Sequence, residues 1–302
     1  MADHTDWPLI SVVVPALNEE RNLPYVFERL PGPLHEVVLV DGGSRDRTVE
    51  VARRLRPDIL VVQQTRKGKG NALACGFAHC TGDIVVMIDA DGSTDPAEIP
   101  RFIAALVDGA DLAKGTRFRD GGGSHDITRL RRLGNAGLNL FVNVLFRTRY
   151  SDLCYGYNAF WARALPGFDL PDPRLPAPAD GSKLWGDGFE IETMLNVRAA
   201  VAGLNVAEVG SVEGARLHGV SNLNAPRDGL RVLRTILVEF RRKRRARTTD
   251  RRAVLANTQE LPTVPRPRPA PTGVVARHSV PGAAVPGQRR PRPAHDDEAL
   301  VG

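Results

Sequence analysis

Two aspartates separated by a single residue, Asp89 and Asp91, directly follow an apolar segment at residues 84–88. Alternate residues at the end of a β-strand point to the same side, so both carboxylates can share one divalent cation. The pair therefore predicts a site for Mg²⁺ or Mn²⁺. A cation held there would bridge a diphosphate and neutralise the charge that develops on a departing nucleoside diphosphate. Paired aspartates also occur in ordinary turns, and it is the position after an apolar strand that favours the metal site.

A second candidate is the segment VDGGSRD at residues 40–46, in which Asp41 ends an apolar run and two glycines follow. Glycine lets the backbone approach a flat ligand closely. An aspartate at this point can accept hydrogen bonds from a nucleobase or a ribose hydroxyl. Taken alone, however, the segment is more typical of a glycine turn in which Asp46 caps the next helix.

The second half of the chain contains many arginines, whose side chains have the chemistry to hold a phosphate group. A guanidinium can donate two parallel hydrogen bonds to phosphate oxygens. A lipid monophosphate is already an anionic nucleophile, whereas a hydroxyl nucleophile needs a carboxylate to take its proton. Asp187 and Glu190 are the candidate bases for a hydroxyl acceptor. The alternative interpretation of the arginines is a set of solvated surface charges.

The elements that must position these residues alternate between strand and helix patterns. Apolar, β-branched runs are each followed by a segment with helical spacing. The predicted strands span residues 9–15, 35–43, 58–64, 83–91 and 110–118. Such alternation predicts an α/β fold, a single Rossmann-like domain with a mostly parallel central sheet flanked by helices. Ligands bind beyond the carboxyl ends of such strands, where the motifs described above fall.

Two later segments predict amphipathic helices. The helix at residues 129–146 could lie on a membrane or pack on the domain; because three asparagines share one face, we expect its apolar stripe to pack inward. Residues 227–248 combine apolar residues at helical spacing with the basic run RRKRRAR. Such a helix is typical of one that lies on an anionic membrane. The alternative is that its apolar face packs on the preceding domain while its basic end is solvated.

Composition divides the chain into a large domain at residues 1–226, the basic helix at 227–248 and a tail at 249–302. The formal net charge is +6, and much of the basic charge lies in the helix and the tail. This predicts an anionic partner such as a nucleotide or a phospholipid headgroup. The tail is rich in proline and arginine and poor in aromatic residues, so it cannot offset the entropy cost of ordering and is predicted to be disordered.

The same inspection predicts a cytoplasmic protein. The apolar runs are far shorter than the roughly 20 residues that cross a bilayer. The first ten residues lack the basic and apolar regions of a signal peptide. Three cysteines, Cys75, Cys80 and Cys154, cannot all pair and have no metal-ligand spacing, which is typical of reduced thiols.

Four motifs occur in an order and spacing that resemble the family-2 glycosyltransferases, in particular the branch of dolichol-phosphate mannose synthases and other polyprenyl-phosphate glycosyltransferases. The motifs are VVVPALNEE at 12–20, VDGGSRD at 40–46, RKGKGNAL at 66–73 and IDADGS at 88–93. The resemblance implies a glycosyltransferase A fold, with the metal on Asp89 and Asp91. It also implies a nucleotide site, formed by Pro15, Leu17, Asn18, Glu19, Asp41, Lys69, Gly70 and Asp89.

The resemblance continues to about residue 240, beyond which the tail lies outside it. The matching segments are KGTRF at 114–118, RRLGN at 131–135, SDLCYGYNAF at 151–160, GFEIET at 188–193 and RLHGVSNL at 216–223. By position, the resemblance implies that the acceptor phosphate is bound by Arg117, Arg131, Arg216 and Ser221. The implied catalytic residues are Asp89, Asp91, Arg117 and Arg131.

Together these features predict an inverting, metal-dependent transferase that moves a hexose from a nucleoside-diphosphate sugar to a polyprenyl, dolichyl-type phosphate. The basic helix would hold it peripherally on the cytoplasmic face of a membrane, and no nucleic-acid partner is expected. One alternative is a family-2 enzyme that acts on a glycan or small-molecule hydroxyl with a carboxylate base. The other is a non-catalytic protein that binds a membrane or nucleic acid. Neither G-x-G-x-x-G after the first strand nor G-x-x-x-x-G-K-[ST] occurs, which disfavours dehydrogenases and P-loop enzymes.

Overall fold

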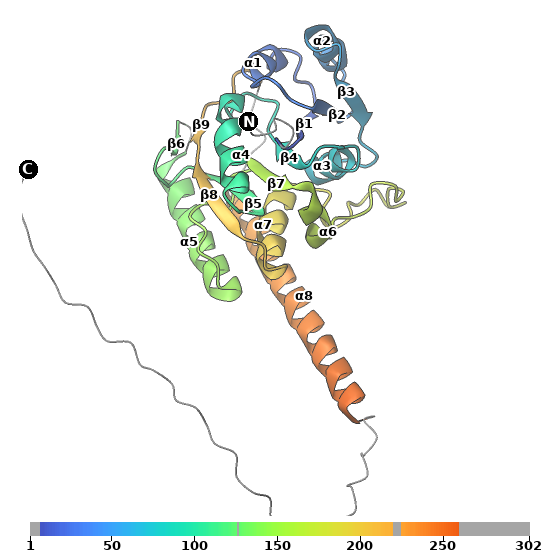
Figure 1. Ribbon diagram of the computed structural model, residues 1–302, viewed down its shortest axis with the longest axis vertical. Helices are drawn as coiled ribbons and strands as arrows, with labels where there is room; N and C mark the ends of the chain where they lie inside the picture. Colours follow the sequence, from blue (N-terminus) through green and yellow to red (C-terminus); the bar gives the residue numbers. More distant parts are fainter. Residues whose placement is uncertain (1–6, 126, 220–224, 260–302) are drawn as a thin grey trace, which may run out of the picture. The chain divides into compact units, whose positions relative to one another are not determined.

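A seven-stranded sheet forms the centre of the protein (Figure 1). The computed structural model describes residues 7–125, 127–219 and 225–259. The strand order across the sheet is β3-β2-β1-β4-β7-β5-β8. The strands are β1 (Ile10–Ala16), β2 (Glu36–Asp41), β3 (Leu60–Gln63), β4 (Ile84–Met87), β5 (Leu112–Thr116), β7 (Asn158–Trp161) and β8 (Val206–Gly210).

All the strand pairs are parallel except those of β7, which runs antiparallel to both β4 and β5. The prediction of a mostly parallel sheet is therefore confirmed. The inner parallel strands β1, β2, β4 and β5 are buried on both faces, which explains their mostly apolar sequences. Their carboxyl ends meet at one edge of the sheet, where Ala16 of β1 lies in register with Asp41 of β2.

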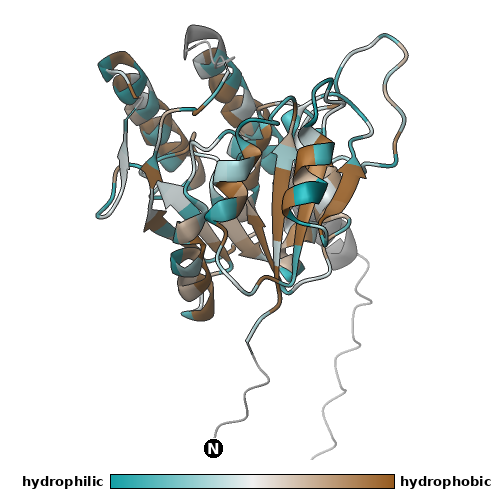
Figure 2. Ribbon diagram, turned by 90° about the horizontal axis from the view of Figure 1, so that it is seen from above, coloured by the Kyte–Doolittle hydropathy of each residue, from teal (hydrophilic) through white to brown (hydrophobic). Residues whose placement is uncertain are grey.

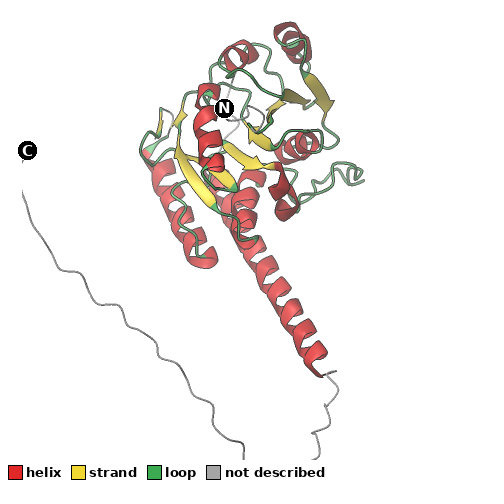
Figure 3. Cartoon of the chain, viewed as in Figure 1, coloured by secondary structure: helices red, strands yellow, loops and turns green. Residues whose placement is uncertain are grey.

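Helices cover both faces of the sheet, as the red and yellow elements of Figure 3 show. The helices are α1 (Leu23–Glu28), α2 (Thr48–Leu55), α3 (Lys69–Phe77), α4 (Ile99–Val107), α5 (Arg129–Phe146), α6 (Leu165–Phe168), α7 (Ile191–Val201) and α8 (Ala225–Gln259), with 3₁₀ turns η1 (Pro96–Glu98) and η2 (Ala162–Ala164). One core lies between the sheet and α1, α2 and α4, and the other lies between the sheet and α3, α6 and α7. Side chains alternate between the two faces along β1, so Val12 and Val14 face the first core and Val13 faces the second. In Figure 2 the central strands are accordingly brown, the colour of hydrophobic residues.

A third apolar cluster joins α5, α7 and α8, and Phe146 of α5 lies edge-on to Phe240 of α8. A short two-stranded sheet pairs β6 (Gly123–Ser124), which follows β5 in the chain, with β9 (Val212–Glu213), which follows β8. Ile236 of α8 is fully buried in the third cluster. The middle of α8 therefore packs on the domain, which is one of the two alternatives for this helix.

The prediction that the apolar stripe of α5 packs inward holds only in part. Val142 and Phe146 are buried in the third cluster, but Asn135 and Asn139 are buried as well, and Leu130, Leu133 and Leu140 face outward. The reason is the segment 150–153 beneath the helix, whose backbone groups are bonded by the asparagine amides: Asn139 accepts from Leu153 N at 2.8 Å, and Asn143 accepts from Tyr150 N at 2.8 Å. Buried backbone groups need partners, so this polar face takes the inner position.

The chain divides into two compact units, residues 1–254 and 255–302. Of the second unit the structure describes residues 255–259, which are helical. Helix α8 thus continues to Gln259, past residue 248, at which the sequence predicts the basic helix to end. Residues 260–302 of the predicted tail lie outside the described part of the chain.

Candidate active site

The loops that follow β1 and β2 form one wall of the candidate site. Asp41 accepts hydrogen bonds from Ser44 N at 3.1 Å and from Gln63 Nε2 at 3.0 Å. Burial raises the pKa of this carboxyl, but these hydrogen bonds outweigh burial and lower it below the ordinary range. Ser44 also accepts from Asn18 N at 2.9 Å, and Asn18 has the left-handed φ of 59° that asparagine tolerates. The first two motifs therefore form a single hydrogen-bonded loop pair.

Pro15, Leu17 and Glu19 lie along this wall. Pro15 is in β1, in register with Val40, and Leu17 is an exposed apolar residue at the rim. Glu19 is buried, and its backbone N–H donates to Thr48 Oγ1 at 2.8 Å. Burial raises the pKa of the Glu19 carboxyl above its ordinary value.

The first aspartate of the predicted metal pair, Asp89, is paired with Lys69 at the start of α3. Lys69 Nζ lies 2.6 Å from Asp89 Oδ1 and 2.5 Å from Glu192 Oε1 on α7. Burial acts to lower the pKa of Lys69, but the two carboxylates outweigh it and raise this pKa. Glu192, which no motif argument identified as a site residue, is thus part of the candidate site.

The second aspartate, Asp91, is paired with Arg216. Arg216 Nη1 lies 3.2 Å from Asp91 Oδ2, and the other terminal nitrogen, Nη2, donates to Glu19. Asp91 also accepts from Ser93 Oγ at 2.6 Å. Each predicted metal ligand is therefore paired with one basic side chain, and Arg216, which the resemblance implies for the acceptor phosphate, lies beside Asp91 and Glu19.

The two aspartates fit a divalent metal whose remaining coordination positions are filled in part by a diphosphate. Mg²⁺ commonly takes one or two carboxylates from the protein and fills its remaining positions with phosphate oxygens and water. The described part of the chain holds no group of three or more His, Cys, Asp or Glu side chains placed to bind a metal ion. The side chains of Asp89 and Asp91 are 31% and 22% exposed, so both remain open to a ligand.

Gly70 is required by a close backbone approach between α3 and the segment 186–188. A Cβ at Gly70 would lie 1.8 Å from the carbonyl oxygen of Gly186. The N–H of Gly70 donates to Asp187 O at 2.9 Å, so the start of α3 is bonded to this segment. The glycine therefore positions Lys69 beside Asp89 by letting the two backbones touch.

Arg117 lies in a second, separate cluster. Its Nε and Nη2 donate to the two oxygens of Asp152 at 2.7 and 2.9 Å, and its Nη1 donates to Glu213 Oε2 at 2.9 Å. Burial raises the pKa of Asp152, but the hydrogen bonds from Arg117 outweigh burial and lower it. Three of the five guanidinium N–H groups are engaged in this way, which leaves two for a further anion.

Helix α5 connects Arg131 with the Arg117 cluster. The backbone N–H of Arg131 is capped by Thr128 Oγ1 at 3.2 Å, so Arg131 lies in the first turn of the helix. One turn further on, Asn135 Nδ2 donates to Asp152 Oδ1 at 3.1 Å. Ser221 lies outside the described residues. The phosphate-binding roles of Arg117, Arg131, Arg216 and Ser221 therefore stay predictions.

Neither candidate base for a hydroxyl acceptor is placed as an open carboxylate. Both oxygens of Asp187 accept from Arg66, at 2.8 and 2.9 Å, and the two side chains are 1% and 2% exposed. Glu190 Oε1 accepts from the backbone N–H groups of Gly186 and Gly188, each at 3.0 Å. Both residues hold the 186–190 segment in shape.

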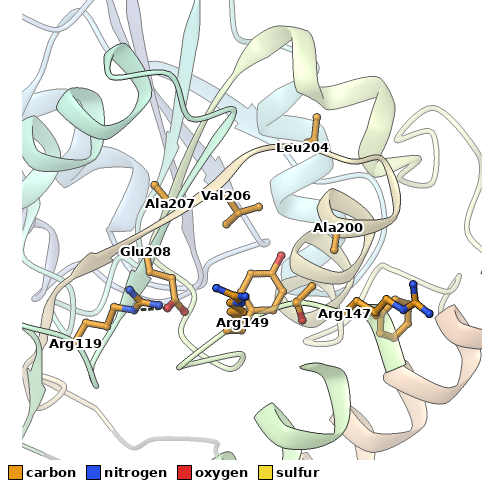
Figure 4. A pocket seen from close by; sticks show the side chains of 11 residues that line it. Arg119, Arg147, Arg149, Ala200, Leu204, Val206, Ala207 and Glu208 are labelled. Atoms are coloured by element: carbon orange, nitrogen blue, oxygen red, sulfur yellow. Dashed lines mark ion pairs between the residues drawn. The ribbon is translucent and has the colours of Figure 1, made fainter. Parts of the chain in front are cut away.

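A pocket of about 590 Å³ lies apart from these residues, beside the edge strand β8 (Figure 4). Arg119, Arg147 and Arg149 line it, and Arg119 pairs with Glu208 at 2.7 Å. The lining contains none of the residues that the sequence predicts for the donor or the metal.

The fold and the site define a glycosyltransferase of the A type: a mostly parallel sheet covered by helices, with an Asp-x-Asp pair at its carboxyl edge. The chain belongs to glycosyl transferase family 2, whose model matches residues 11–165. None of the described helices combines the length and the apolar character that crossing a membrane requires.

Curated relatives support the family assignment. A dolichol-phosphate mannosyltransferase of Pyrococcus furiosus is 36% identical over 221 residues, which cover 71% of this chain and 59% of that protein. The match therefore spans less than two thirds of that relative. An uncharacterised glycosyltransferase of Mycobacterium tuberculosis is 32% identical over 215 residues, which cover 71% of this chain and 89% of that protein.

Solved structures agree on the fold. Glucosyl-3-phosphoglycerate synthase of Mycobacterium tuberculosis, crystallised with Mn²⁺, UDP-glucose and phosphoglyceric acid, matches with a TM-score of 0.59 at 25% identity. The match covers 77% of this chain and 80% of that one.

Proposed function

We propose that this glycosyltransferase moves a hexose from a nucleoside-diphosphate sugar to a polyprenyl phosphate, with inversion at the anomeric carbon. The donor half of the proposal rests on the loop pair after β1 and β2. Asp41 and Glu19 present acceptor oxygens to the nucleoside, and Asn18 fixes the turn between them. Lys69 and Arg216 supply positive charge beside the diphosphate.

The observation that carries the lipid-phosphate acceptor is the pairing of Asp187 with Arg66. A hydroxyl acceptor needs a carboxylate that can accept a proton, within hydrogen-bond reach of the nucleophile. Asp187 has both oxygens bonded to a buried guanidinium and is almost fully shielded from solvent. A phosphate monoester avoids this requirement, since its oxygen attacks as an anion and the nucleoside diphosphate leaves with the bonding electrons.

On the acceptor side, arginines act by holding the phosphate rather than by moving a proton. Arg131 lies in the first turn of α5, and Arg117 keeps two N–H groups besides those given to Asp152 and Glu213. The carboxylates fix the plane of the Arg117 guanidinium. A fixed fork binds a phosphate with little loss of side-chain freedom.

A divalent cation, Mg²⁺ or Mn²⁺, would be held by Asp89 and Asp91, and when bound it supplies charge neutralisation for the departing diphosphate. The chain's own part is to keep both carboxylates at the end of β4 and to give Lys69 and Arg216 alternative partners. Glu192 can retain Lys69, and Glu19 can retain Arg216, when Asp89 and Asp91 are engaged elsewhere.

The acceptor is a lipid, so the proposal includes peripheral association with the cytoplasmic face of a membrane. The basic segment 241–247 of α8 provides charge for anionic headgroups. The Pyrococcus furiosus relative, which is named a dolichol-phosphate mannosyltransferase, supports the same substrate class.

The test is transfer of radiolabel from a panel of nucleotide sugars, with Mg²⁺ or Mn²⁺, into an organic-extractable polyprenyl phosphate. We expect label in the organic phase with one donor, and loss of labelling when EDTA is added. Donor hydrolysis without lipid labelling in any combination would reject the polyprenyl-phosphate acceptor.

A second candidate is transfer to the hydroxyl of a small phosphorylated acid. It is favoured by the similarity to glucosyl-3-phosphoglycerate synthase, whose crystal structure contains phosphoglyceric acid. The same assay separates the two candidates, because a product of this kind stays in the aqueous phase. Aqueous labelling that needs 3-phosphoglycerate would establish the second candidate.

A further inference from the structure

The outward face of α5 is apolar along its length. Leu130, Leu133, Leu140 and Val144 are between 67% and 73% exposed, and they recur at intervals of three, seven and four residues. These intervals place all four on one side of the helix. At 1.5 Å per residue, the stripe from Leu130 to Val144 is about 21 Å long.

The sequence between the leucines adds nothing polar to this face. Between Leu133 and Val144 the exposed residues are glycine, alanine and leucine, and α5 contains no acidic residue. Monomeric soluble proteins rarely expose a contiguous apolar surface of this kind, and one that does usually has a partner for it.

The helix cannot bury the stripe by rotating. Its opposite face is bonded to segment 150–153 by three asparagines, among them Asn143, whose Nδ2 donates to Tyr150 O at 2.9 Å and whose Oδ1 accepts from Tyr150 N at 2.8 Å. Rotation would leave those backbone groups buried without partners, so the exposed position of the stripe is enforced.

Basic residues stand at both ends of the stripe. Arg129 and Arg132 are exposed in the first turns, and Arg147 and Arg149 are exposed just past the last turn, where Figure 4 shows them in the pocket beside β8. An apolar strip between clusters of arginines is complementary to a bilayer with anionic headgroups, because side chains enter the interface while guanidinium groups stay at headgroup level.

We propose that the outward face of α5 docks on an anionic lipid bilayer and carries the acceptor end of the site to the membrane. The same helix bonds Asp152 through Asn135, and Asp152 holds Arg117. The stripe thus begins on the turns of α5 that contact the Arg117 cluster. This inference rests on the proposed function for the choice of a lipid partner, but its test does not use catalysis.

The experiment is co-sedimentation of the full chain with vesicles of phosphatidylcholine and phosphatidylglycerol at 7:3, with pure phosphatidylcholine vesicles in parallel. The variant is Leu133→Gln with Leu140→Gln. The matched control is Leu55→Gln with Leu175→Gln, which removes two leucines that are 40% and 48% exposed elsewhere on the surface. Circular dichroism melts verify that each protein is folded.

We expect the wild type and the control to bind the anionic vesicles, and the α5 variant to partition roughly tenfold less, because two apolar side chains no longer enter the interface. A Leu133→Met, Leu140→Met variant should restore binding. Arg147→Gln with Arg149→Gln should reduce binding to the anionic vesicles alone, and this variant remains informative if the glutamine variant does not fold.

The inference would be overturned if the wild type and the folded α5 variant partitioned equally. If the glutamine variant is unfolded, equal partitioning of the wild type and the arginine variant would overturn it instead. A wild-type dimer that the α5 variant converts to a monomer, with no vesicle binding by either, would assign the stripe to self-association instead. The vesicles contain no polyprenyl phosphate or nucleotide sugar. Vesicle binding without lipid labelling in the transfer assay would therefore reject the proposed function and leave this inference standing.

Discussion

In the loop pair after β1 and β2, polar groups bond across adjacent strands, whereas the buried guanidinium groups of Arg66 and Arg117 bond to carboxylates far along the chain. Asn18, Glu19 and Gln63 each reach partners 22 to 29 residues away, across adjacent parallel strands. Arg117 reaches Glu213 across 96 residues, and Arg66 reaches Asp187 across 121. The loop pair is thus built from strand ends, and the two buried arginines join separate parts of the chain.

The difference has an energetic consequence. Parallel strand ends are positioned by the sheet itself, so their polar side chains remain available for a ligand. Buried ion pairs must compensate the cost of desolvating two charges, and they do so only while both partners are present. Residues of the strand-end loops should therefore respond to substitution mainly in activity, and the buried arginine pairs mainly in stability.

The largest effect is expected for Asp91→Asn, which should lower transfer on the order of 100-fold or more because a neutral amide is a poor ligand for a hard cation. The response to added Mg²⁺ or Mn²⁺ should be lost as well, with little change in the unfolding midpoint. Rates measured against metal concentration provide the test.

The control for that substitution is Asp83→Asn at the opposite end of β4, where the carboxylate accepts only from the exposed Leu9 N–H among the described residues. We expect it to keep full activity. Unchanged turnover and metal response in Asp91→Asn would show that Asp91 does not hold the metal.

Among the buried pairs, Arg66→Met should cost about 3–5 kcal/mol of unfolding free energy, since it leaves the buried Asp187 carboxylate unpaired. Arg174→Met is the matched control, because Arg174 pairs with Asp172 on the surface with an 88% exposed side chain, and it should not move the midpoint. Urea unfolding of both variants provides the test. Equal shifts of the two midpoints would contradict the expected difference between a buried and a surface ion pair.

Much of the fold could be predicted from the sequence. The strands at 10–16, 36–41 and 84–87 and helix α5 fall where apolar runs and helical spacing place them. The VDGGSRD loop stands out because its partners are near in sequence, and the Asp-x-Asp pair because it directly follows an apolar strand. The family assignment is confirmed.

The rest depends on contacts that periodicity does not encode. Glu192 reaches Lys69 because α7 packs beside α3, and Glu213 reaches Arg117 through a strand far along the chain. The α5 asparagines lie on the inner face because segment 150–153 passes beneath them. Hydrophobicity alone places such polar groups outside, so the inward position of these asparagines could not be predicted from it.

The smallest effects are expected at two glycines in helices, Gly70 in α3 and Gly137 in α5. Gly70 in α3 touches the backbone of Gly186, so Gly70→Ala should destabilise the protein by about 1–3 kcal/mol through overpacking. A Cβ added at Gly137 in α5 would meet nothing within 4 Å. There the alanine only reduces the freedom of the unfolded chain and favours the helix, and Gly137→Ala should stabilise the protein by about 0.5–1 kcal/mol. Thermal unfolding of the two variants should therefore move the midpoint in opposite directions. A loss of stability in Gly137→Ala would mean that the outward face of α5 is already packed against another surface in solution, as a second copy of the chain would provide.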